Sequence, residues 1–286
     1  MVDIELLYRQ QLTDSDLRLL REAAGAGLPV TAALATPAAE AAVFAAAGPL
    51  QPPGPLEAPG PVHSQVALGV SPFLAFAVAV HRTAARLGTA SFVEERWGPR
   101  VRIPLFDVAT LRALVADPLR RWFLVDLLAS YTRVSSGVVW TRTARGWRRR
   151  RFSELDPASL AEQLSLVGPS EQAGVYRRLG DLALFLLGVF PDHLPSLTGA
   201  ARDRLLRLSG VDEDRSEELD GRSLLEYLGS RWYSAALAAA RAAGHPVTDP
   251  LAVAGYMGDH FGDARRVLNS VTDRYLFPIR EQWFGR

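Results

Sequence analysis

The chain has 286 residues, of which 48% are hydrophobic and 22% charged, a composition typical of folded globular proteins and too apolar for a disordered one. It has no cysteine and its 32 basic residues are all arginine, which excludes disulfides, thiolate nucleophiles, cysteine-bound metals and lysine-dependent catalysis. The formal net charge of +1 conceals a strong asymmetry. Residues 81–153 contain fifteen arginines and five acidic residues, whereas residues 1–60 and 154–286 are both net acidic.

The first segment, residues 1–60, is predicted to be a helical region followed by a linker. Asp14 can cap a helix over 15–24, and the alanine-rich stretch 38–47 indicates a second helix. The proline-rich stretch 48–61 is incompatible with a helix or a central strand and favours an extended loop. Because the N-terminal sequence lacks the basic and apolar blocks of a secretory signal, we expect a cytoplasmic protein.

The second segment, residues 61–153, is predicted to be a basic domain of helices and hairpins. Its apolar stretch 66–80 is too short to span a bilayer, so we expect no membrane contact, and a helix begins within it at Ser71-Pro72. The remaining elements are expected in this order: strand-like runs within 92–106, helices over 108–116 and 118–134, and strands over 138–142 and 147–152.

The third segment, residues 154–286, is predicted to be a helical bundle. Its apolar periodicity indicates helices over 157–167, 171–190, 198–209, 222–243, 250–261 and 262–277. No alternation of strands and helices indicates a parallel sheet. The predicted fold class is therefore mainly α, with a bundle in the C-terminal half and one or two small β-hairpins in the middle segment.

The hairpin formed by the last two predicted strands is the most distinctive feature, because it holds six arginines and no acidic residue between Trp140 and Ser153. If Arg142 pairs with Trp147, aromatic and guanidinium side chains alternate on one face. Arginine binds phosphate groups with two hydrogen bonds, and tryptophan offers a surface on which bases stack. The candidate binding residues are Trp140, Arg142, Trp147, Arg148, Arg149, Arg150 and Arg151.

These residues support two interpretations. The leading hypothesis is a non-enzymatic binding or regulatory protein, without cofactor or metal, whose hairpin contacts nucleic acid or an acidic protein surface. In the structural alternative, the tryptophans pack on the helix over 118–134 while arginine stems cover their edges, and the charge faces the acidic C-terminal half of the chain.

A second constellation lies in the C-terminal half, where the pairs Asp192-His193 and Asp259-His260 could together bind a metal or form an acid–base pair. Asp181 follows Arg177 by four residues and can form a buried ion pair with it. A histidine on an apolar stripe is usually a hydrogen-bonded core residue, so whether the protein is an enzyme stays open. The catalytic candidates are Asp181, His193, Asp259 and His260.

A third alternative is a subunit of a protein scaffold, with homo-oligomerisation left open. The apolar segment 61–80 and the aromatic segment 275–284 could supply a hydrophobic interface for it. A contiguous apolar surface of this kind is a common mark of protein–protein contact.

Overall fold

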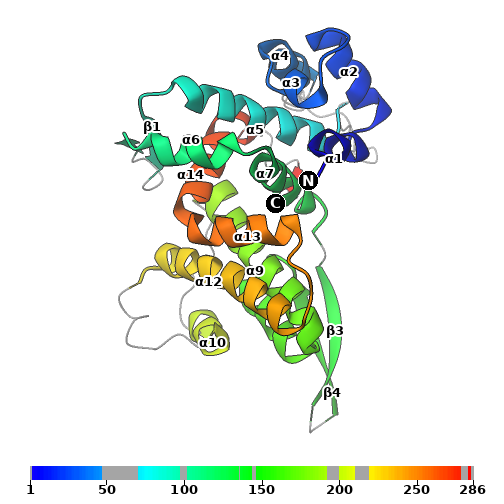
Figure 1. The fold of residues 1–286 in the computed structure, drawn as a ribbon. Coiled ribbons are helices and arrows are strands. Elements are labelled where there is room, and N and C mark those ends of the chain that lie inside the picture. The colour runs from blue at the N-terminus through cyan, green and yellow to red at the C-terminus, as the bar shows by residue number, and fades with distance from the viewer. Residues whose placement is uncertain are drawn as a thin grey trace, which may run out of the picture. The chain divides into compact units, whose positions relative to one another are not determined.

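The computed structural model describes residues 2–46, 70–96, 102–134, 136–143, 146–191, 200–209, 219–277 and 283–284. Over these stretches the fold is mainly α, with two two-stranded antiparallel hairpins in the middle of the chain, which confirms the predicted fold class (Figure 1). None of the helices in these stretches is long and apolar enough to cross a membrane.

The chain folds as two compact units, each built from segments that are separated in the sequence. Unit 1 comprises Met1–Ala90, Val115–Thr132 and Asp273–Arg286, and unit 2 comprises Ser91–Leu114 and Arg133–Thr272. The three segments expected from the sequence are defined by composition and charge, whereas the units are defined by packing. The expected boundaries at residues 60 and 153 therefore stay a prediction.

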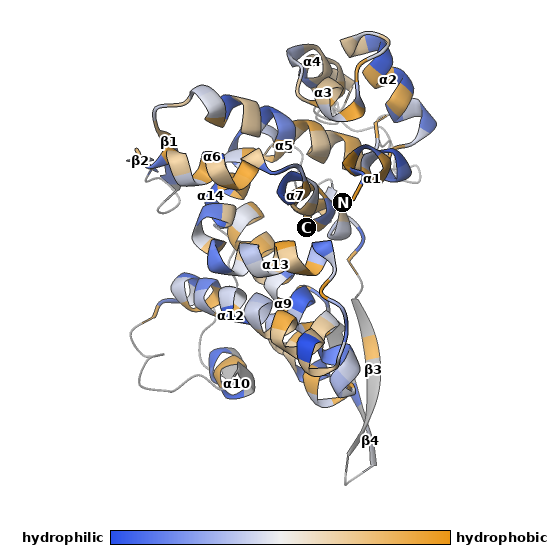
Figure 2. Cartoon of the chain, in the orientation of Figure 1, coloured by the Kyte–Doolittle hydropathy of each residue, from blue (hydrophilic) through white to orange (hydrophobic). Residues whose placement is uncertain are grey.

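Unit 1 is built around helix α5 (Pro72–Thr89), whose N-terminal half carries most of its apolar residues (Figure 2). The helix begins where the sequence predicts, because the Ser71 hydroxyl accepts a hydrogen bond from the Leu74 N–H (3.1 Å). Every residue from Phe73 to His81 is buried, so this stretch is core. The other helices of the unit are α1 (Ile4–Gln11), α2 (Asp14–Ala24), α3 (Val30–Leu34), α4 (Pro37–Ala46) and α7 (Pro118–Ser130).

Aromatic residues late in the chain complete the core of unit 1 and correct one expectation. Phe76 of α5 stacks on Phe284 with ring centroids 5.5 Å apart, and it meets Trp283 edge-on at 5.2 Å. Both partners and Tyr275 are buried inside the chain. The sequence analysis expected segments 61–80 and 275–284 to form an exposed hydrophobic interface. This expectation is wrong for Tyr275, Trp283 and Phe284 and for residues 73–80, because these residues are buried in the core of unit 1.

Two short helices of unit 1, α1 and α3, are additional to those expected from the sequence. Asp3 caps α1 through the N–H of Glu5 and of the next residue. The Glu5 carboxylate in turn accepts hydrogen bonds from the N–H groups of Val30 (2.8 Å) and Thr31 (3.0 Å) at the start of α3. Because this second cap lies 25 residues away in the sequence, no local pattern shows it.

Unit 2 is centred on two long helices, α9 (Pro169–Val189) and α12 (Gly221–Ala242), which pack side by side (Figure 1). Glycines allow this close approach, because a Cβ added at Gly180 would lie 2.7 Å from the Tyr233 ring and one at Gly229 would collide with Phe261. The other elements that begin in unit 2 are β1 (Val93–Arg96), β2 (Arg102–Leu105), α6 (Val108–Ala116), β3 (Ser136–Thr143), β4 (Gly146–Ser153), α8 (Pro157–Ala161), α10 (Ala200–Ser209), α13 (Asp249–Asp259) and α14 (Phe261–Val271).

Three helices end earlier than their apolar patterns predict. Helix α7 stops at Ser130, α8 gives way to a 3₁₀ turn over Glu162–Ser165, and α14 gives way to a π-helical turn over Thr272–Leu276. A 3₁₀ or π turn at the end of an α-helix keeps the following side chains near the same face of the helix. The spacing of apolar residues therefore continues beyond the last α-helical hydrogen bond.

Replacing Gly180 with alanine is expected to destabilise the protein by roughly 1–3 kcal/mol, because the new methyl group would collide with the buried Tyr233 ring. The matched control is Gly174→Ala on the same helix, where nothing lies within 4 Å of the added Cβ. This substitution should be neutral or stabilising by up to about 1 kcal/mol. Urea unfolding measures both variants, and equal effects would contradict the close packing of α9 on α12.

A buried histidine pairs with a buried tyrosine in unit 1. His81 Nε2 on α5 lies 2.9 Å from the Tyr8 hydroxyl on α1, and the two rings meet edge-on at 5.4 Å. Burial, reinforced by the positive charge of Arg121, lowers the pKa of His81 to about 3. The imidazole is therefore neutral in the folded protein at neutral pH.

This pKa difference makes unit 1 sensitive to acid. In the unfolded chain His81 binds a proton below about pH 6.5, whereas in the folded chain it binds one only near pH 3. The unfolded state therefore holds one more proton between these values, and stability should fall by up to about 1.4 kcal/mol for each pH unit below 6.5.

Urea unfolding between pH 7 and pH 5 measures this effect. We expect His81→Gln to remove this part of the pH dependence, and the matched control His245→Gln, at an exposed histidine, to retain it. The same slope in the wild type and in His81→Gln would show that His81 does not titrate differently in the two states.

Candidate functional site

The register of β3 and β4 is the one on which the binding hypothesis depends. Arg142 pairs with Trp147, Trp140 pairs with Arg149, and Val138 pairs with Arg151. Since paired residues of an antiparallel hairpin lie on the same face, tryptophan and arginine positions alternate on one face, as the sequence predicts. The strands are longer than expected and leave a two-residue connection, 144–145, which lies outside the described residues.

Glycine is favoured at the first residue of β4. Gly146 has a φ of +109°, in a region that side chains rarely adopt. The sequence reveals this turn through its glycine, and the observed pairing of Thr143 with Gly146 selects the shorter of the two connections, two or four residues, that the alternation allows.

Three side chains of this face are described, and all three are exposed. Trp147 is 67% exposed, and Val138 and Arg149 are exposed as well. The structural alternative would place the tryptophans on α7 of unit 1, whereas the hairpin belongs to unit 2, so this alternative stays a prediction. The remaining candidates have backbone positions fixed by the register, but their side chains lie outside the described part of the structure: Trp140, Arg142, Arg148, Arg150 and Arg151.

The base of the hairpin is anchored to the helices of unit 2. Glu154 follows β4 directly, and its Oε1 accepts a hydrogen bond from Arg178 Nε on α9 (2.8 Å) and lies 2.6 Å from Arg178 Nη2 in an ion pair. Asp156 then caps α8 through the N–H of Ala158 (3.1 Å). The hairpin therefore extends from a fixed base (Figure 1).

Asp181 lies between α9 and α12 inside unit 2, where it forms the ion pair that the sequence predicts, and its catalytic role stays a prediction. It is buried, and the Tyr233 hydroxyl donates a 2.8 Å hydrogen bond to its Oδ1. Its Oδ2 lies 3.7 Å from Arg177 Nε, which confirms the expected ion pair. The carboxylate joins α9 to α12, and its partners come from the chain itself.

The other acid–base candidates lie at the junction of α13 and α14. Asp259 and His260 are both exposed, which corrects the expectation of a core histidine. The His260 ring stacks on Tyr256 at 4.3 Å, and its Nδ1 lies 3.9 Å from Asp263 Oδ2. The apolar stripe misplaces His260 because α13 ends just before it. His193 and its neighbour Asp192 lie outside the described residues. A site formed by these two residues together with Asp259 and His260 therefore stays a prediction.

Asp259 also lines an open polar groove in unit 2. The groove is bordered by Ser223, Glu226, Tyr227, Ser230, Gly258, Asp259, Phe261 and Gly262. Within the described stretches, no three histidine or acidic side chains lie close enough to hold a metal ion. The groove offers hydroxyls and carboxylates to a polar ligand.

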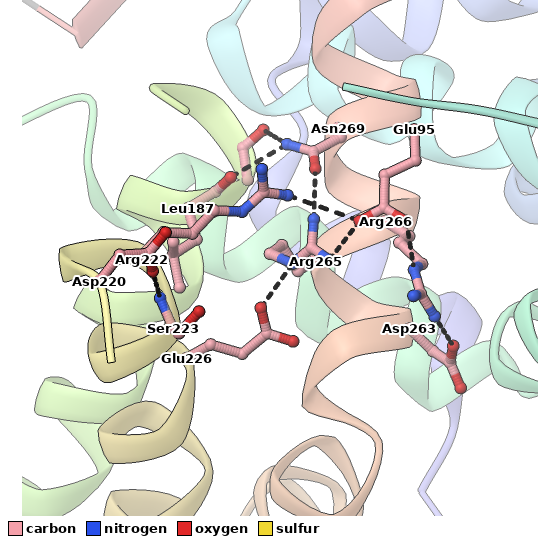
Figure 3. Close-up of polar contacts among 11 residues, drawn as sticks. Glu95, Leu187, Asp220, Arg222, Ser223, Glu226, Asp263, Arg265, Arg266 and Asn269 are labelled. Carbon is pink, nitrogen blue, oxygen red and sulfur yellow. Dashed lines mark hydrogen bonds and ion pairs between the residues drawn. The ribbon is translucent and has the colours of Figure 1, made fainter. Parts of the chain in front are cut away.

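Sequence reasoning missed an ion cluster around Glu95 of β1 (Figure 3). Glu95 Oε1 lies 2.6 Å from Arg265 Nη2 and 3.5 Å from Arg222 Nη2, and Oε2 lies 3.1 Å from Arg266 Nε. Burial opposes ionisation of Glu95, but hydrogen bonds and charge from Arg265 and Arg266 outweigh it and lower the pKa of the carboxyl. The partners lie 127 to 171 residues away in the sequence, so no local signal could reveal them.

Comparisons with known proteins identify no relative. No model of a known protein family matches the chain. No curated protein matches its sequence, and no solved structure matches its fold. The function of the chain is therefore argued from its own residues and their geometry.

Proposed function

We propose that the chain is a non-enzymatic nucleic-acid-binding protein whose β3–β4 hairpin contacts the ligand. The observation that carries this proposal is the exposed pair Trp147 and Arg149 on a face where tryptophan and arginine positions alternate. The cytoplasm is the compartment that we propose for this activity. The alternative partner, an acidic protein surface, would form ion pairs with the same arginines, but its carboxylates would not stack on the exposed indole of Trp147.

Trp147 favours a single-stranded ligand over a duplex. A base stacked on an indole contributes about 1–3 kcal/mol in single-strand complexes. In a duplex the faces of the bases are already stacked on one another, so an indole would have to displace a base before it could stack. Single-stranded RNA or DNA offers its base faces without this cost.

Arginine supplies the second part of the recognition. Its planar guanidinium binds a phosphate oxygen pair with two hydrogen bonds, and it stays charged at every relevant pH. Arg149 is exposed beside Trp147, and residues 81–153 carry an excess of ten positive charges. Binding should therefore weaken as salt rises, because phosphate neutralisation releases counterions.

Fluorescence anisotropy with labelled single-stranded oligonucleotides across a salt series tests the proposal. We expect Trp147→Ala to weaken binding by roughly 5- to 150-fold, equivalent to one lost stacking contact. We expect Arg149→Gln to reduce the slope of log affinity against log salt by about 0.7.

Two controls come from the other hairpin. Phe106→Ala removes a ring that is 74% exposed, and Arg102→Gln removes an exposed arginine of β2, and neither should change binding. Inorganic polyphosphate measures attraction to phosphate without bases. The proposal would be overturned if no oligonucleotide bound at low salt, or if the Trp147→Ala/Arg149→Gln double variant bound like the wild type.

A further inference from the structure

A small cavity opens in unit 1 where α3 lies against α1 and α2 (Figure 1). The residues that line it come from these three helices and from the loop that joins α2 to α3. Its volume is about 40 Å³, which is room for roughly three water molecules or for a branched aliphatic group of about three or four carbons.

The floor of the cavity is apolar. It is formed by Leu20 of α2 and by Val30 and Ala33 of α3, and all three side chains are buried. Leu28 in the connecting loop adds an aliphatic side chain at the edge, and this side chain is 47% exposed. Among the described residues that line the cavity, none is acidic. The floor therefore suits an aliphatic group and offers no partner to a cation.

Two arginines border the cavity, Arg9 from α1 and Arg21 from α2. Both side chains are exposed, and neither forms an ion pair with a carboxylate in the described part of the chain. Each arginine lies in the last turn of its helix, where the helix dipole favours a positive charge. This attraction leaves the guanidinium N–H groups available to a ligand.

Two carboxylates of α1 and α2 hold backbone groups instead of these arginines. Glu5 accepts hydrogen bonds from the first two N–H groups of α3. Asp16 accepts hydrogen bonds from the N–H groups of Thr13 and Ser71, both at 2.9 Å. Residues 1–60 contain three arginines, so two of the three border this one cavity. An apolar floor beside two guanidinium groups fits a ligand that is aliphatic at one end and anionic at the other.

We propose that this cavity binds a carboxylate group attached to a short branched aliphatic chain. The aliphatic chain enters the cavity over Leu20, Val30 and Ala33, while the carboxylate stays at the edge with Arg9 and Arg21. A guanidinium group can donate two parallel hydrogen bonds to a carboxylate. Two sources carry this chemistry: a free branched-chain acid, and the C-terminus of a peptide that ends in an aliphatic residue. The cavity belongs to unit 1 and the β3–β4 hairpin to unit 2, so this proposal does not rest on the proposed function.

Titration of the full-length protein with 3-methylbutanoate, followed through the NMR signals of its backbone amides, tests the site. Acetate carries the same charge without the branched chain, and 3-methylbutanamide has the same shape without the charge. We expect 3-methylbutanoate to bind at least about tenfold more tightly than acetate, because each methylene that enters the cavity increases affinity roughly fourfold. The amide should bind at least about threefold more weakly than 3-methylbutanoate.

Arginine variants test the charged edge of the cavity. The double variant Arg9→Gln/Arg21→Gln should bind 3-methylbutanoate as weakly as the amide, and its affinity for the amide should equal that of the wild type. Arg18→Gln is the matched control, because it removes an exposed arginine of α2 that does not line the cavity, and it should bind like the wild type. If the double variant does not fold, the two single variants are compared in the same way.

N-acetyl-leucine, a model of a peptide C-terminus, distinguishes the two sources. Tighter binding than that of 3-methylbutanoate supports a peptide ligand, and weaker binding supports a free acid. Equal affinity for the acid and its amide would overturn the proposal, as would a double variant that bound the acid like the wild type. Shifted amide signals should come from the cavity residues within 9–33, and shifts confined to other parts of the chain would contradict the assignment.

Discussion

The packing of α12 against α9 is the contact on which the β3–β4 hairpin and the ion cluster around Glu95 both depend. Helix α9 holds the base of the β3–β4 hairpin through Arg178, and its last carbonyls hold Asn269 beside Arg265. Helix α12 supplies Arg222 to the same cluster. The two helices approach closely because Gly180 leaves room for the Tyr233 ring, whose hydroxyl then binds Asp181. A small change at this crossing would therefore displace groups that lie far from it.

The absence of lysine gives every cation of the chain the same chemistry. A guanidinium group does not lose its proton at physiological pH, so the three arginines around Glu95 stay charged. The low pKa of Glu95 likewise keeps its carboxylate charged near neutrality. Changes of pH near 7 therefore leave these ion pairs intact, and their strength depends mainly on salt.

The sequence predicted the elements that depend on local periodicity. The pairing of Arg142 with Trp147 follows from the period of two in a hairpin, and the start of α5 follows from Ser71-Pro72. Contacts between distant residues could not be predicted in this way. The partners of Glu95 are examples, because a carboxylate in a short strand looks like an ordinary surface residue until the fold brings three arginines to it.

The stacking of Phe76 on Phe284 has a consequence for how the protein is made. Unit 1 contains both residues, whereas almost all of the chain between Ser91 and Thr272 belongs to unit 2. All residues of unit 2 are therefore synthesised before the aromatic residues that complete the core of unit 1. Until Phe284 emerges, the early helices of unit 1 lack one of the rings that cover Phe76.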